Sequence, residues 1–113
     1  NKKYSQAILN LEIVRTQKPD DMEIMLLLAE AYIKTKRSQQ AIPLLDKAKS
    51  SKKHAVYVRD LLYKLYKQTN DKKHAEEEII QLIELTENVK YKFMYVRDLI
   101  DNKNYVKALN LFQ

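Results

Sequence analysis

Apolar residues recur along this chain at spacings of three and four, in stretches separated by short polar segments. This spacing is typical of amphipathic helices, and the abundant residues Leu, Ile, Lys, Glu and Ala favour helix. The predicted apolar stripes are Ala7, Ile8, Leu11 and Val14; Met25, Leu28, Ala29 and Tyr32; Ala41, Leu44, Leu45 and Ala48; Val58, Leu61, Leu62, Leu65 and Tyr66; Ala75, Ile79, Leu82 and Ile83; and a last pair running from Tyr91 through Ala108 to Phe112. The pattern therefore predicts an all-α protein of short helices, with turns at "KTKRS", "KQTNDKK" and "DNKN".

The predicted helices repeat in pairs with a period of thirty-four residues. Ala7, Ala41 and Ala75 are separated by this step, and apolar positions after each alanine keep it as well. A small residue lets two helix backbones approach closely. A helix pair that cannot bury its apolar face alone buries it against the next pair. The period therefore predicts an α-solenoid of stacked antiparallel helix pairs.

The register of the last unit is ambiguous in the sequence. Ala108 follows Ala75 by thirty-three residues, whereas the segment "YVRDL" occurs at 57–61 and again at 95–99, a step of thirty-eight. The two steps differ by about one helical turn. They therefore place the first helix of this unit differently.

The composition excludes several classes of function. The 113 residues include no glycine, which phosphate-binding loops, dinucleotide fingerprints and nucleophile elbows all require. They also include no cysteine, so disulfides and thiolate metal sites are excluded. His54 and His74 are isolated, and the four-residue step from His74 to Glu78 suits a surface pair better than a metal site. We predict no catalytic residue, no metal and no cofactor, and hence a protein that is not an enzyme.

The apolar run at 24–29 is too short to cross a membrane, and no signal peptide leads the chain. A soluble protein is therefore expected, with the cytoplasm as the default location.

At the repeated positions the chain resembles the tetratricopeptide repeat family. The resemblance implies a right-handed superhelix of about three to three and a half repeats in one domain, with units at about 1–21, 22–55, 56–88 and 89–113. The first and last units are incomplete, and neither end has a capping helix, so we expect a piece of a longer array. The family pattern is matched at Met25, Leu28, Ala29, Tyr32, Ala41, Leu45 and Ala48, with Pro19 closing the preceding unit.

In this family the first helices of successive units line a concave groove that holds partners. By register, the resemblance predicts a partner-binding groove of Leu26, Glu30, Ile33, Tyr57, Asp60, Lys64, Lys67, Tyr91, Met94 and Asp98. The alternative is that several residues here, Leu27 and Leu61 in particular, simply pack between neighbouring helices. The positions that form the family's clamp for chaperone tails hold Leu, Glu and Tyr instead of Lys, Asn and Arg, so that ligand is not expected.

Basic residues are concentrated between Lys47 and Lys73, where nine Lys or Arg face two acids, a net of +7 against +6 for the whole chain. Such a segment favours an acidic partner, or else forms a solvated face that keeps the protein soluble. The leading hypothesis is a protein-interaction scaffold that holds a partner's peptide or helix in the groove. The alternatives are RNA binding through 47–73 and self-assembly through the uncapped ends.

Overall fold

The computed structural model describes residues 2–112. Over this range it contains helices and no strand, as the apolar pattern predicted. The helices are α1 (Lys2–Gln17), α2 (Met22–Lys34), α3 (Ser38–Ala48), α4 (Ala55–Gln68), α5 (Lys72–Leu85), α6 (Lys90–Asp101) and α7 (Tyr105–Asn110).

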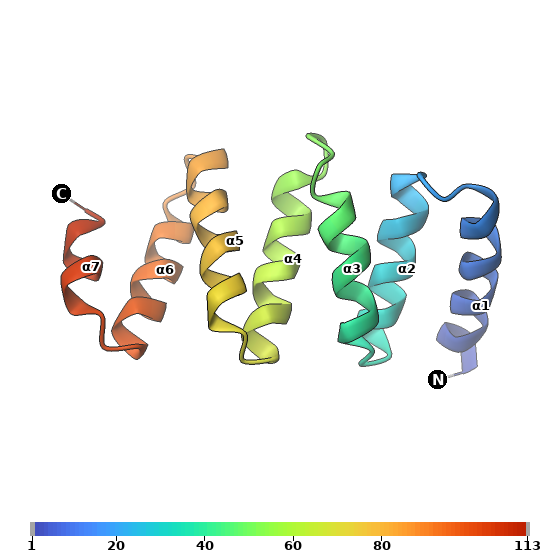
Figure 1. Cartoon of the computed structure of the whole chain (residues 1–113), viewed down its shortest axis with the longest axis horizontal. Helices are drawn as coiled ribbons and strands as arrows, with labels where there is room; N and C mark the ends of the chain where they lie inside the picture. Colours follow the sequence, from blue (N-terminus) through green and yellow to red (C-terminus); the bar gives the residue numbers. More distant parts are fainter. Residues whose placement is uncertain (1, 113) are drawn as a thin grey trace.

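The helices stand side by side in one row, with α1 at one end and α7 at the other (Figure 1). The molecule measures 49 × 27 × 18 Å. Among the described residues, backbone contacts between helices join only helices that follow each other in sequence. Each helix therefore depends on its immediate neighbours, which is the organisation of an α-solenoid.

Side-chain caps and left-handed residues set the ends of the helices. Asp21 and Asp71 cap α2 and α5, each with a side-chain oxygen that accepts from the backbone N–H three residues later at 3.2 Å. The turns that close α2, α4 and α6 contain Lys36, Asn70 and Lys103, with φ of 62°, 60° and 62°. In each turn the next residue's N–H donates back to a carbonyl of the last helical turn, at 2.7, 2.8 and 2.7 Å. This is a Schellman motif, repeated three times without glycine.

These three turns resolve the register of the last unit. Lys36, Asn70 and Lys103 are equivalent, and the step from Asn70 to Lys103 is thirty-three residues. The alanine step of thirty-three is therefore the structural one. The two "YVRDL" segments occupy different positions in their units.

Three of the four recurring alanines are buried in the core. Ala41, Ala75 and Ala108 are 0%, 2% and 8% exposed, whereas Ala7 is only half-buried because α1 has a single neighbour. Ile8 is the buried residue of that helix. The core continues through all units as one cluster that includes Met25, Leu28, Leu45, Val58, Leu62, Ile79, Leu82, Tyr95 and Leu99. None of the described helices combines the length and apolar character needed to cross a bilayer.

Candidate partner-binding surface

The ten residues of the predicted groove all belong to α2, α4 and α6, the first helices of successive units. We call the surface that these helices share the first-helix face. Leu26 and Tyr91 are only 6% and 4% exposed, so they pack in the core. This agrees with the alternative interpretation, in which some residues of the predicted groove pack between neighbouring helices. Leu27 is 52% exposed, however, so packing between helices does not account for it.

Tyrosine hydroxyls bridge the first helices of neighbouring units. Tyr57 Oη donates to Glu30 Oε1 on α2 at 2.8 Å, and Tyr91 Oη on α6 donates to Asp60 Oδ2 on α4 at 2.8 Å. A third hydroxyl, on Tyr63 of α4, donates to Asp98 Oδ2 at 2.5 Å. No backbone contact joins one first helix to the next among the described residues, so these side chains bridge them directly. The result is a tyrosine–carboxylate ladder along the first-helix face.

Two lysines complete the ladder. Lys64 Nζ lies 2.8 Å from Asp60 Oδ1, and Lys67 Nζ lies 2.5 Å from Asp98 Oδ1. Burial raises the pKa of Asp60, but hydrogen bonds from Lys64 and Tyr91 outweigh it and leave that pKa below its usual value. Asp60 and Asp98 each accept from a lysine and a tyrosine, and Glu30 accepts from Tyr57.

The tyrosines of the ladder stay protonated well above neutral pH. Burial and the hydrogen bond to Asp60 raise the pKa of Tyr91 to about 12. Burial and Asp98 raise the pKa of Tyr63 as well. A neutral hydroxyl is the donor that each carboxylate needs, so the ladder persists over the physiological range.

The basic segment 47–73 does not form one basic surface. Five acidic residues neutralise much of its charge. Asp60 lies within the segment, and the others, Asp20, Asp46, Glu78 and Asp98, lie outside it. The pairs are Lys47–Asp20 at 3.9 Å, Lys49–Asp46 at 2.7 Å, Lys49–Glu78 at 3.4 Å, Arg59–Glu78 at 2.7 Å, Lys64–Asp60 at 2.8 Å and Lys67–Asp98 at 2.5 Å. Within the described range, Lys52, Lys53, Lys72 and Lys73 make no ion pair. The first two lie in the α3–α4 connection and the other two at the start of α5, on opposite edges of the row (Figure 1).

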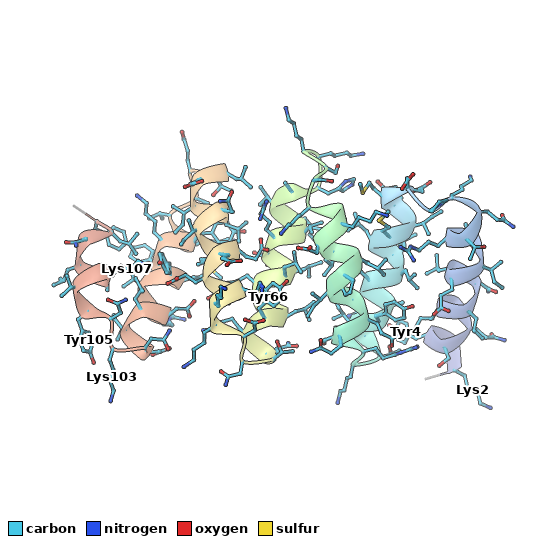
Figure 2. All side chains as sticks on the ribbon, viewed as in Figure 1. Lys2, Tyr4, Tyr66, Lys103, Tyr105 and Lys107 are labelled. Carbon is cyan, nitrogen blue, oxygen red and sulfur yellow. The ribbon has the colours of Figure 1, made fainter. Side chains whose placement is uncertain are left out.

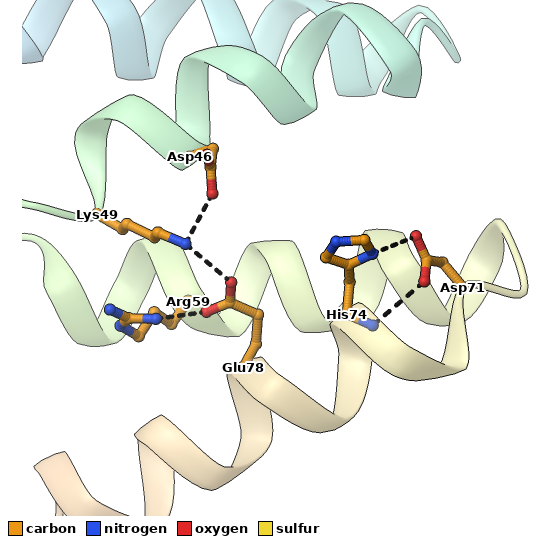
Figure 3. A network of polar contacts seen from close by, with 6 residues as sticks. All are labelled: Asp46, Lys49, Arg59, Asp71, His74 and Glu78. Atoms are coloured by element: carbon orange, nitrogen blue, oxygen red, sulfur yellow. Dashed lines mark hydrogen bonds and ion pairs between the residues drawn. The ribbon is translucent and has the colours of Figure 1, made fainter.

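Glu78 is 3% exposed and is the one charged residue buried within residues 2–112. Figure 3 shows Glu78 on α5 between Arg59 of α4 and Lys49 at the end of α3, with Asp46 on the far side of Lys49. The expected pair between His74 and Glu78 is wrong, because tertiary contacts give Glu78 closer cations. The ring of His74 instead bonds Asp71, with Nδ1 and Oδ2 2.7 Å apart. The network joins three helices from two units and is therefore structural.

A cleft of about 410 Å³ opens between the α4–α5 turn and the end of α6. We call it the elbow cleft. Lys67 and Asp98 line it, so it adjoins the first-helix face at one end. The residues that line it are Tyr66, Lys67, Asn70, Asp71, Lys72, Lys73, Ala75, Glu76, Tyr95, Asp98, Leu99, Asp101 and Asn102.

The sequence analysis missed two parts of this surface. Tyr63 stands where the family pattern places a small residue, and nothing in the local sequence indicated that its hydroxyl reaches Asp98, thirty-five residues away. The elbow cleft was missed as well. The cleft could have been predicted from the polar turns, which recur in the sequence at the repeat period. In a solenoid such turns lie side by side, so a cleft between two of them is expected.

Comparison with known proteins identifies the family. A family model described as tetratricopeptide repeat matches residues 1–65, which is more than half of the chain. The chain belongs to the tetratricopeptide repeat family. No curated protein matches the sequence.

Two solved structures share the fold of this tetratricopeptide repeat chain. The MamA RS-1 ArsTM double mutant has a TM-score of 0.78 at 17% identity, over 97% of this chain and 62% of that one. MamA 41-end from Desulfovibrio magneticus RS-1 has a TM-score of 0.76 at 17% identity, over 98% of this chain and 63% of that one. The chain thus spans less than two thirds of either structure. The comparisons confirm the predicted family and the predicted helical-repeat fold.

Proposed function

We propose that this chain is a protein-interaction scaffold that holds a segment of a partner protein along the first-helix face. The observation that carries the proposal is the exposure of Leu27 and Tyr57, 52% and 47%, on adjacent first helices. Partly exposed aromatic and aliphatic side chains on a fixed framework provide contact area at small entropic cost. Membership of a repeat family that serves as interaction scaffolds supports the same function.

The tyrosine–carboxylate ladder supports a preformed surface. Glu30, Asp60 and Asp98 are each fixed by a hydroxyl from the neighbouring unit. Side chains that are already ordered lose little conformational entropy when a partner binds. The face therefore presents a defined contact surface before the partner arrives.

Charge on the face does not favour a strongly acidic partner. The predicted set contributes three carboxylates and the lysines Lys64 and Lys67, each of which is already paired. A partner segment of mixed charge with apolar anchors suits this surface better. The same pairing weakens the case for RNA, because the four lysines without acid partners stand in two separated pairs.

An affinity capture from cell extract tests the proposal. The test variant is Leu27→Asp with Tyr57→Ala. The matched control is Leu85→Asp, at a leucine of similar exposure, 50%, on a second helix. We expect a distinct protein to be retained by the wild type and the control but not by the test variant, with nuclease treatment making no difference. Equal capture by both variants, or capture that nuclease removes, would contradict the proposal.

Self-association through the terminal helices is a second candidate function. Leu9 and Ile13 of α1 are 60% and 61% exposed, and Val106 and Leu109 of α7 are 73% and 71% exposed. Exposed apolar side chains that form a contiguous patch are typical of association surfaces. Sedimentation velocity over a hundredfold range of concentration tests it. A mass that grows in the wild type but not in Leu9→Asp, Ile13→Asp would support assembly, whereas a constant monomer mass would exclude it.

A further inference from the structure

The elbow cleft has an apolar floor with fixed walls. Ala75, Tyr95 and Leu99 are 2%, 4% and 2% exposed and close its base. Tyr95 Oη donates to Glu76 Oε2 at 3.0 Å, and Lys107 Nζ lies 3.6 Å from the same oxygen. Figure 2 shows Lys107 on α7 and Tyr66 on α4, the helices on either side of α5 and α6. Residues of three consecutive helices, α4, α5 and α6, thus line the cleft.

Most of the acidic groups in the cleft are already satisfied. Asp98 accepts from Tyr63 and Lys67, and Glu76 accepts from Tyr95 with Lys107 beside it. Asp71 caps α5 and bonds the ring of His74. These carboxylates have their donors within the chain, so they do not determine which ligand the cleft attracts.

Three charged groups in the cleft have no ion-pair partner within the described residues, although Lys73 interacts electrostatically with Asp71. Lys72 and Lys73, on the α5 side, and Asp101, on the α6 side, are exposed and make no ion pair among residues 2–112. One wall therefore offers two cations and the opposite wall one anion. Charges of both signs, separated across an apolar floor, are complementary to a ligand that carries an anion and a cation.

The polar groups on the two turns favour one form of that ligand. Asn70 and Asn102, one on each turn, line the cleft, and their side-chain amides can both donate and accept. An extended segment has free backbone N–H and C=O groups to bond such amides, whereas a helix uses most of these groups internally. A nucleic acid strand does not fit the charges, since Asp101 repels phosphate.

We propose that the elbow cleft binds an extended segment of a partner protein, with an acidic side chain at Lys72 and Lys73 and a basic side chain at Asp101. This inference rests on the proposed function, because Lys67 and Asp98 belong to both surfaces and a bound segment continues from one to the other. The first-helix face then supplies apolar contact, and the elbow cleft supplies the choice of sequence.

Selection of peptides from a random dodecamer library displayed on phage tests this inference on the whole chain. Enriched peptides are synthesised, and their affinities are measured by fluorescence anisotropy. The cleft variants are Lys72→Glu with Lys73→Glu, and Asp101→Lys. The matched control is Lys52→Glu with Lys53→Glu, which makes the same change of charge at unpaired lysines on the opposite edge.

We expect enriched peptides to share one acidic and one basic position. The lysine reversal should weaken their binding at least tenfold, and exchanging the peptide's acidic residue for lysine should restore it. The control should change the affinity less than twofold. Peptides that lose affinity with Leu27→Asp, Tyr57→Ala but not with the cleft variants would overturn this inference and leave the proposed function standing. If no peptide is enriched, the inference fails, while the capture experiment still decides the proposed function.

Discussion

Replacement of Lys36 by glycine should stabilise the protein, although it removes a side chain. Lys36 occupies the left-handed position of the α2–α3 turn with φ of 62°, and its side chain is exposed. A residue with a Cβ is strained in this conformation, whereas glycine adopts it freely. Because the turn repeats along the chain, the same reasoning applies at Asn70 and Lys103.

The magnitude follows from two opposing effects. Left-handed backbone costs an ordinary residue about 1–2 kcal/mol, all of which glycine avoids. Glycine also makes the unfolded chain more flexible, which costs about 0.4–1 kcal/mol of stability. The difference predicts a net gain of about 0.5–1 kcal/mol for Lys36→Gly. The gain at Asn70 should be smaller, because asparagine tolerates the left-handed region better than lysine does.

Urea denaturation monitored by circular dichroism measures this gain. The matched control is Lys34→Gly, which makes the same substitution two residues earlier, within helical backbone, where glycine should cost about 0.5–1 kcal/mol. The two variants are thus expected to shift the free energy of unfolding in opposite directions. If Lys36→Gly destabilises the protein as much as Lys34→Gly does, backbone strain at this turn is not the controlling factor and the reasoning is refuted.

Three further predictions concern burial, pH and packing. Glu78→Ala should lower the free energy of unfolding by about 1–3 kcal/mol in the same assay, because it removes the acceptor of the partly buried Arg59 and Lys49. Asp46→Ala, at an exposed pair, should cost less than about 1 kcal/mol, and equal losses would argue against a special role for burial. Burial and the hydrogen bond to Asp60 raise the pKa of Tyr91 to about 12, above the ordinary tyrosine value of about 10. Its contribution to stability should therefore be complete below pH 10 and decline as the pH rises toward 12, and Tyr91→Phe should flatten this slope in urea titrations. Ala41→Leu, at a fully buried position, should lower the free energy of unfolding by about 1–3 kcal/mol through overpacking. An unchanged melting temperature would contradict this prediction.

Local sequence was sufficient for the repeat and for most of the core. The alanine at positions 41, 75 and 108 is the buried small residue of each pair, and turns of similar length separate the helices. These features could be predicted because helix periodicity and close packing depend on residues three or four apart and on one neighbouring helix. The register of α6 was ambiguous for the same reason, since two local patterns conflicted and only the left-handed turn at Lys103 decided between them.

The sequence by itself thus determined an all-α chain of repeated helix pairs and the family to which it belongs. Tertiary structure alone decided how the charges are distributed. A basic segment became a set of ion pairs because stacking brings Asp20, Glu78 and Asp98 next to its lysines and arginine. The same stacking buried Glu78, carried the hydroxyl of Tyr63 to Asp98 and left Lys72, Lys73 and Asp101 facing the elbow cleft. Electrostatic interactions depend on distance in space, and in a solenoid residues about thirty positions apart in sequence are neighbours.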